Sequence, residues 1–188
     1  MKKTLILGLG NILCGDEGIG CRLTEHLFAY NIFPENVLLN DGGTMGQELL
    51  GRIMETDNLL IIDCADFGKV PGETTLKYDN EIPVWLAARK MSPHQTSFAE
   101  VLALAQLKNS LPEKMALMGI QPNKINFGDV LSPLLQKRLL IYEEIVKKIL
   151  LKWQISFKPT KNKGFLNNTP TGIQYCEKEW AKTFFNTP

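Results

Sequence analysis

The feature that most constrains the fold is a series of short apolar runs, each followed by a carboxylate or a glycine. Such runs span Thr4–Gly8, Val37–Asp41 and Leu59–Asp63. The last of them does not alternate apolar with polar residues, which is typical of a strand covered by helices on both faces. Between the runs, apolar residues recur at helical spacing, as at Ile19 and Leu23. This alternation of strands and helices predicts a parallel sheet.

One expected strand breaks the alternation. Only a short, glycine- and proline-containing stretch separates Asp63 from the apolar segment Thr74–Tyr78, whereas a parallel crossover needs about a dozen residues or more. The fourth strand is therefore expected to be antiparallel and at an edge. The remaining predicted elements are helices over Met45–Met54, Pro83–Lys90, Ser97–Leu107 and Ser132–Lys152 and a fifth strand over Lys114–Ile120. The expected fold class is α/β, with three layers: a twisted, mostly parallel five-stranded sheet with helices on both faces.

The length of 188 residues fits one domain. Residues 1–153 are expected to form a single α/β domain. Residues 154–188 are rich in Lys, Asn, Thr and Pro and are interpreted as a partly flexible C-terminal extension. A short helix is expected around Cys176–Phe185, and the aromatic residues there leave docking on the body or on a partner open.

Charge and hydropathy exclude several classes of protein. With 21 Lys and Arg against 20 Asp and Glu, the net charge is +1, so a dedicated nucleic-acid binder is not expected. The first apolar run has five or six residues, fewer than the roughly 7–15 of a secretory signal, and no stretch approaches the ~18 apolar residues of a membrane span. A cytoplasmic protein without membrane association is expected. Its cysteines (Cys14, Cys21, Cys64 and Cys176) are interpreted as small core residues.

Residues that can bind a metal or take part in catalysis lie where the predicted strands end. Glu17 follows the first strand, Asp41 ends the second, Asp63 ends the third, and His94 lies before the Ser97–Leu107 helix. In open α/β sheets, ligands bind beyond the carboxyl ends of the strands. Two carboxylates and one imidazole suit a divalent first-row metal. Three protein ligands with vacant positions are typical of a catalytic rather than a structural site. Glu17, Asp63 and His94 are therefore candidate metal ligands.

Each candidate also has an ordinary structural interpretation. Glu17 could be a solvent-exposed carboxylate that interacts favourably with the N-terminus of the following helix. Asp63 could be a solvent-exposed residue at the end of its strand. His94 fits a turn. Asp41, which precedes two glycines, is typical of a turn former, although it can also orient a ligand. His26 is assigned to helix packing, because its spacing matches that of its apolar neighbours.

Common cofactor and nucleophile motifs are absent from the sequence. After Gly8-Leu9-Gly10, the third glycine of a dinucleotide fingerprint is replaced by Leu13, and Glu17 would repel a pyrophosphate. The chain contains neither a GxxxxGK[ST] phosphate loop nor a GxSxG elbow. A cysteine–histidine pair formed in space rather than in sequence stays open.

Four sequence blocks together resemble the nickel–iron hydrogenase maturation endopeptidases. They are GLGNILCGDEGIG at 8–20, LNDGGTMGQELLG at 39–51, LLIIDCAD at 59–66 and SPHQTSFAEVL at 92–102. The resemblance covers roughly residues 3–150 and is closest to the long variant of the family, which serves membrane-bound uptake hydrogenases. The family fold, a mostly parallel five-stranded sheet between helices, agrees with the pattern above.

The resemblance implies an endopeptidase with a protein partner. Its substrate would be the precursor of the hydrogenase large subunit, whose C-terminal extension is removed after nickel insertion. The metal-contacting and catalytic residues of the family correspond to Glu17, Asp63 and His94, with Asp41 in a supporting role. Nickel would be carried by the substrate, so no tightly bound metal of the chain's own is expected. A monomer that meets its substrate transiently is expected.

Two alternatives remain at this stage. A peptidyl-tRNA hydrolase-like enzyme also begins with a strand and GLGN, and His26 lies soon after that motif. Such an enzyme needs a basic RNA-binding surface, whereas residues 1–151 carry a net charge of −3. The second alternative is a non-catalytic chaperone that binds nickel or the large subunit without cutting it.

Overall fold

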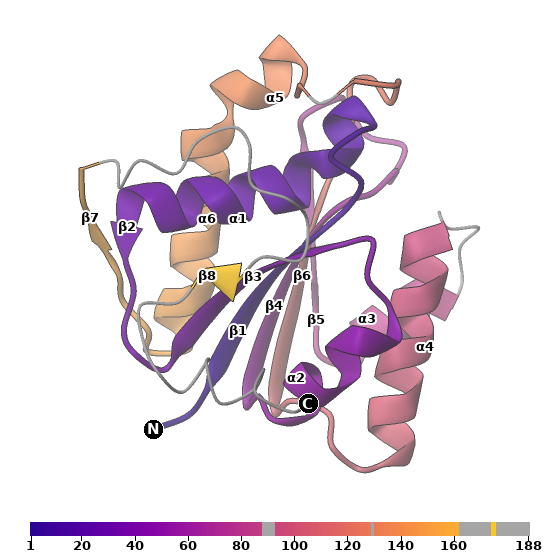
Figure 1. Ribbon diagram of the computed structural model, residues 1–188, viewed down its shortest axis with the longest axis vertical. Coiled ribbons are helices and arrows are strands. Elements are labelled where there is room, and N and C mark those ends of the chain that lie inside the picture. The colour runs from indigo at the N-terminus through magenta and orange to yellow at the C-terminus, as the bar shows by residue number, and fades with distance from the viewer. Residues whose placement is uncertain (88–92, 129, 162–173, 176–188) are drawn as a thin grey trace.

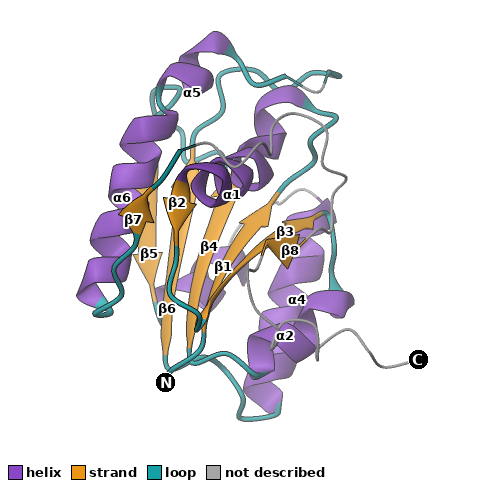
Figure 2. Cartoon of the chain, turned by 60° about the vertical axis from the view of Figure 1, so that its left-hand side comes forward, coloured by secondary structure: helices purple, strands orange, loops and turns teal. Residues whose placement is uncertain are grey.

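A computed structural model describes residues 1–87, 93–128, 130–161 and 174–175, and of residues 87, 93–97 and 174–175 it describes the backbone alone. The described part has three layers, with a twisted sheet between two groups of helices (Figures 1 and 2). Helices α1, α5 and α6 cover one face of the sheet, and α2, α3 and α4 cover the other. The predicted α/β class is confirmed.

The main sheet has the strand order β5-β6-β4-β1-β3-β8. Its strands are β1 (Thr4–Leu9), β3 (Val37–Gly43), β4 (Asn58–Cys64), β5 (Thr74–Tyr78), β6 (Lys114–Ile120) and β8 (Gln174–Tyr175). Strands β3, β1, β4 and β6 are parallel neighbours, whereas β5 pairs with β6 in the antiparallel direction and forms one edge. The prediction of an antiparallel edge strand over Thr74–Tyr78 is confirmed.

The helices and a second, two-stranded sheet complete the described part. The helices are α1 (Ile19–Tyr30), α2 (Leu50–Met54), α3 (Glu81–Ala87), α4 (Pro93–Leu107), α5 (Pro133–Lys137) and α6 (Leu139–Lys152). Two 3-10 helices, η1 (Gly15–Gly18) and η2 (Gln47–Leu49), precede α1 and α2. Strands β2 (Asn31–Ile32) and β7 (Lys158–Pro159) pair in the antiparallel direction.

Several expectations about the helices need correction. The helix expected over Ser132–Lys152 is two helices, because the hydrogen-bond pattern changes at Arg138, whose N–H donates to the carbonyl oxygen of Leu135, three residues back, at 3.0 Å. The helix expected over Met45–Met54 is the 3-10 turn η2 followed by the short α2, because the chain turns first at Gly42, whose carbonyl accepts the Met45 N–H. The helix expected around Cys176–Phe185 lies outside the described residues.

The C-terminal extension contributes to the body. Ile155 and Phe157 are buried in the core on the α1 side of the sheet, and β7 follows them. Further along, β8 pairs with Leu39 and Asn40 of β3, which adds a sixth strand to the five that were expected. The expected boundary at 153/154 thus falls just before a packed segment.

Strand alternation divides the core between the two faces. In β4, Leu60, Ile62 and Cys64 face α1 and α6, whereas Leu59 and Ile61 face α2, α3 and α4. Every residue of β1, β3 and β4 is buried, as the uninterrupted apolar runs predict. Among the described helices, none is long and apolar enough to cross a bilayer.

Candidate functional site

The start of α1 lies directly on the carboxyl ends of two central strands. A Cβ atom at Gly20 would lie 2.2 Å from the carbonyl oxygen of Ile62 in β4 and 2.3 Å from that of Leu9 in β1. Only a residue without a side chain permits this approach. The preceding η1, which contains Glu17, is therefore held at the end of the sheet where β4 presents Asp63.

Two buried thiols lie near the carboxylates of the candidate site. Burial is the main cause that raises the pKa of Cys64, and the negative charges of Asp63 and Glu17 add to it. Burial likewise raises the pKa of Cys21 well above its usual value, and Asp41 and Asp63 contribute. Glu17 and Asp63 therefore both lie near Cys64, and Asp41 and Asp63 both lie near Cys21.

Asp63 is the penultimate residue of β4 and lies on the face that α4 covers. Its side chain is 2 % exposed, and its position in the strand places it on the side of Leu59 and Ile61. The neighbouring residue in β6 is Gly119, and the Phe67 ring occupies the place of its missing side chain. Phe67 stacks on Trp85 with 4.8 Å between ring centroids. These rings form an apolar wall beside the carboxylate.

Asp41 shapes the turn that follows β3. Its Oδ1 accepts the backbone N–H of Gly43 at 2.9 Å, as expected for a carboxylate that stabilises a turn two residues on. Burial raises the pKa of Asp41, against hydrogen bonds from the Cys21 thiol and the Gly43 N–H that favour the charged form. The turn-forming role is confirmed.

His94 is the second residue of α4. This helix runs opposite to the parallel strands, so its first turn lies toward the end of the sheet where β4 ends (Figure 1). The His94 side chain lies outside the described part of the chain. Among the side chains that are described, no three His, Cys, Asp or Glu residues gather closely enough to hold a metal ion. Participation of the imidazole in a site with Glu17 and Asp63 therefore stays a prediction.

A further acidic residue, Asp16, was not singled out from the sequence. Its fully buried side chain accepts the backbone N–H groups of Asn123 and Lys124 on Oδ2, both at 3.0 Å, and that of Ser132 on Oδ1 at 2.7 Å. The available signal was the acidic pair that Asp16 forms with Glu17 between glycines. Asp16 ties the element that carries Glu17 to the loop between β6 and α5.

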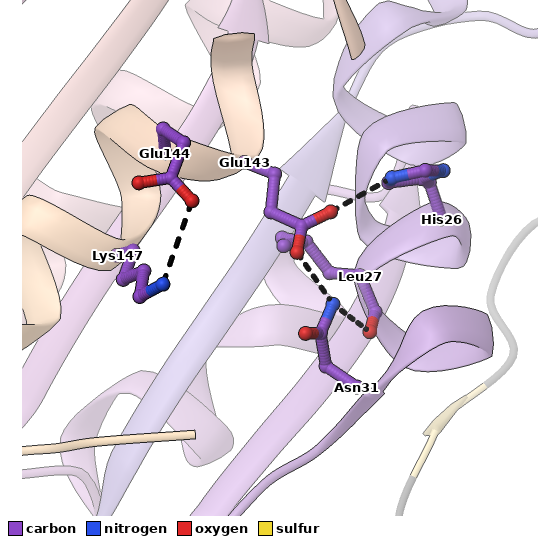
Figure 3. Close-up of polar contacts among 6 residues, drawn as sticks. All are labelled: His26, Leu27, Asn31, Glu143, Glu144 and Lys147. Atoms are coloured by element: carbon purple, nitrogen blue, oxygen red, sulfur yellow. Dashed lines mark hydrogen bonds and ion pairs between the residues drawn. The ribbon is translucent and has the colours of Figure 1, made fainter. Parts of the chain in front are cut away.

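His26 lies at the contact of α1 with α6 (Figure 3). Its Nε2 lies 2.9 Å from Oε2 of Glu143, whose Oε1 accepts a hydrogen bond from Asn31 at 3.0 Å. The hydrogen bond to His26 is the main cause that lowers the pKa of Glu143. The assignment of His26 to helix packing is confirmed, which removes the histidine that the peptidyl-tRNA hydrolase alternative requires.

Comparison with known proteins points to one family. The profile of the hydrogenase maturation proteases matches residues 21–150, a range that includes Asp41, Asp63 and His94 and begins after Glu17. The chain is 40 % identical over 154 residues to the hydrogenase expression/formation protein HupD of Thiocapsa roseopersicina, covering 81 % of this chain and 70 % of the relative. It is 36 % identical over 156 residues to HupD of Bradyrhizobium diazoefficiens, covering 82 % and 81 %.

A solved structure agrees with these sequence relatives. The hydrogenase maturating endopeptidase HybD from E. coli superposes with a TM-score of 0.80 at 34 % sequence identity. The match covers 84 % of this chain and 97 % of HybD. The likeness therefore extends over nearly the whole relative and concerns both fold and sequence.

Proposed function

Because the chain belongs to the hydrogenase maturation proteases, a family of peptide hydrolases, we propose that it removes the C-terminal extension of a nickel–iron hydrogenase large-subunit precursor after nickel insertion. The observation that supports the proposal most directly is the close packing of Gly20 on the carbonyl oxygens of Leu9 and Ile62, which holds the turn that carries Glu17 at the end of the sheet where β4 presents Asp63. Asp41 supports this arrangement through the turn that it stabilises.

Recognition would depend on nickel that the substrate already holds. Glu17, Asp63 and His94 offer two oxygen ligands and one nitrogen ligand, which suit vacant positions on a divalent first-row metal. Binding there fixes the precursor relative to the enzyme and brings the scissile bond close, which is a proximity effect. Without nickel, the same polar groups have no cation to bind, so affinity for the precursor should fall.

The hydrolytic step requires a base and an activated carbonyl. The substrate's nickel supplies a Lewis acid that polarises the scissile carbonyl or a water molecule. Asp63, buried beside the Phe67–Trp85 wall, is the carboxylate that we assign as general base for the attacking water. The nucleophile in this proposal is water. The thiols of Cys21 and Cys64 are buried, and the pKa values of Cys14, Cys21 and Cys64 are all raised, so none of the three is an activated thiolate.

The proposal is tested with purified protein and nickel-loaded precursor, with trimming followed by mass spectrometry. Asp63→Ala and His94→Ala are each expected to abolish cleavage while preserving the far-ultraviolet circular dichroism. Glu55→Ala serves as the control, because Glu55 is an exposed carboxylate that follows α2 at the opposite end of β4. This variant should cleave the precursor normally. Normal cleavage by either site variant would refute the assignment. Wild-type protein that binds the precursor but leaves it uncut would instead support a chaperone.

The role of metal is tested in two further measurements. Nickel-free precursor is expected to remain uncut under the same conditions. The purified chain is expected to hold little metal after dialysis, because the nickel belongs to the substrate. Stoichiometric zinc or nickel that survives dialysis would favour a self-contained metallopeptidase. The protein is further proposed to act in the cytoplasm as a monomer.

A further inference from the structure

Two loops beside Glu17 expose large apolar side chains. Leu13 precedes η1, and Ile125, Phe127 and Val130 lie between β6 and α5; all four are more than half exposed, and Phe127 is 88 % exposed. We call these four residues the apolar rim. Exposed apolar residues are ordinary when scattered singly, whereas a group on adjoining loops is typical of an interaction site.

Backbone hydrogen bonds hold the two loops together. The N–H of Gly15 donates to the carbonyl oxygen of Gly128 at 2.6 Å. The N–H of Gly128 donates to the carbonyl oxygen of Leu13 at 2.9 Å. The buried Asp16 carboxylate adds three hydrogen bonds from the second loop. The rim is therefore displayed on a preformed support, which reduces the entropy lost when a partner binds.

The rim is continuous with the candidate site. The backbone N–H of Glu17 donates to the carbonyl oxygen of Cys14, the residue after Leu13, at 3.3 Å, and Cys14 forms a β-bridge with Gly128 of the second loop. In Figure 1 the loop before α5 lies beside the start of the η1 and α1 segment. A protein whose cleaved segment reaches Glu17 and Asp63 would have its neighbouring surface over this rim.

We propose that the apolar rim is the docking surface for the folded body of the large-subunit precursor, an inference that rests on the proposed function. The partner's contribution is an apolar patch next to its nickel site. Asn123, Lys124 and Asn126, which are also exposed, surround the rim with polar groups. An apolar centre with a polar border is the usual anatomy of a protein interface. The rim would thus bind the precursor body while Glu17 and Asp63 bind the nickel that the precursor holds.

The test is a comparison of steady-state kinetics on nickel-loaded precursor using the full chain. The double variant Ile125→Ser/Phe127→Ser is expected to raise KM by about tenfold or more and to leave kcat within about twofold, because it removes binding but no reacting group. Leu107→Ser is the matched control, because Leu107 is 80 % exposed at the far end of α4. The KM of this variant should equal that of the wild type. Thermal melts verify that each variant is folded.

The remaining outcomes separate the two proposals. A wild-type KM in the double variant, with normal cleavage by the wild type, overturns the docking inference and leaves the proposed function intact. Absence of cleavage by the wild type overturns the proposed function itself. Sedimentation of the chain alone provides the last comparison. A wild-type dimer that dissociates in the double variant, with KM unchanged, would make the rim a contact between copies and would also overturn the inference.

Discussion

The Oδ1 atom of Asp16 accepts the backbone N–H of Ser132 at 2.7 Å, across 116 residues of sequence. Ser132 in turn is the N-cap of α5, since its Oγ accepts the N–H of Leu135. A single buried carboxylate therefore links the 3-10 turn that carries Glu17 to the loop that carries the apolar rim. The relative position of these two parts of the site depends on this link.

Asp16→Asn is expected to lower the free energy of unfolding by about 2–4 kcal/mol, because an amide presents only one acceptor to three N–H donors. Urea unfolding at pH 7 measures the change. Glu55→Gln, which alters an exposed carboxylate, should change it by no more than about 0.5 kcal/mol. A loss of the same small size in Asp16→Asn would show that the carboxylate does not stabilise the loop.

Gly20→Ala is expected to destabilise the protein by more than about 3 kcal/mol, because the new Cβ would lie 2.2 Å and 2.3 Å from backbone oxygens that cannot move aside. Gly51→Ala in α2 is the matched control. Its Cβ would have no atom within 4 Å, so it should be neutral or stabilising by about 0.5–1 kcal/mol. Equal melting temperatures for the two variants would contradict the close contact of α1 with the sheet.

The His26–Glu143 pair predicts a pH dependence of stability. The folded-state pKa of Glu143 is below its usual value of 4.5, with the His26 hydrogen bond as the main cause. The charged carboxylate therefore stabilises the fold above about pH 4.5, and this contribution is lost as the pH falls through the folded-state pKa. The Glu143 side chain is 15 % exposed. Glu143→Gln should lower the free energy of unfolding by about 1–2 kcal/mol at pH 7.

The measurement is the difference in urea unfolding between wild type and Glu143→Gln at pH 7 and near pH 3. The difference should shrink at the lower pH. Glu144→Gln is the control, since the neighbouring Glu144 is more than half exposed and its contact with Lys147 is as long as 3.5 Å (Figure 3). If the difference in the free energy of unfolding is the same at both pH values, the charged Glu143 carboxylate does not stabilise the fold through His26.

The position of Glu17 can be probed without any substrate. Burial and then the charge and hydrogen bond of Glu17 raise the pKa of the Cys14 thiol. Glu17→Gln is expected to lower that pKa toward 9.0 and so to accelerate alkylation of Cys14 by iodoacetamide at pH 8. Peptide mass spectrometry identifies the labelled cysteine, and the buried Cys21 and Cys64 act as internal references. An unchanged rate would place Glu17 away from Cys14.

Local patterns were sufficient for most of the sheet. The uninterrupted run around Leu59–Asp63 and the short link before Thr74–Tyr78 predicted a buried parallel strand and an antiparallel edge strand, and both are present. The break at Arg138 and the pairing of β8 with β3 were not predicted. Helical periodicity continues across such a break, and a two-residue strand has too few residues to show alternation.

The sequence by itself determined the α/β class and the strand that carries Asp63, and it predicted the sheet end at which Glu17, Asp41 and Asp63 are expected, because apolar period and connection length are local properties of the chain. Only the tertiary structure decided that Asp16 supports the loop before α5, that His26 pairs with Glu143, and that the carbonyl oxygen of Leu13 accepts the N–H of Gly128. Those relationships join residues more than a hundred positions apart, and they follow from close packing at Gly20 and from the satisfaction of buried polar groups, which no local pattern records.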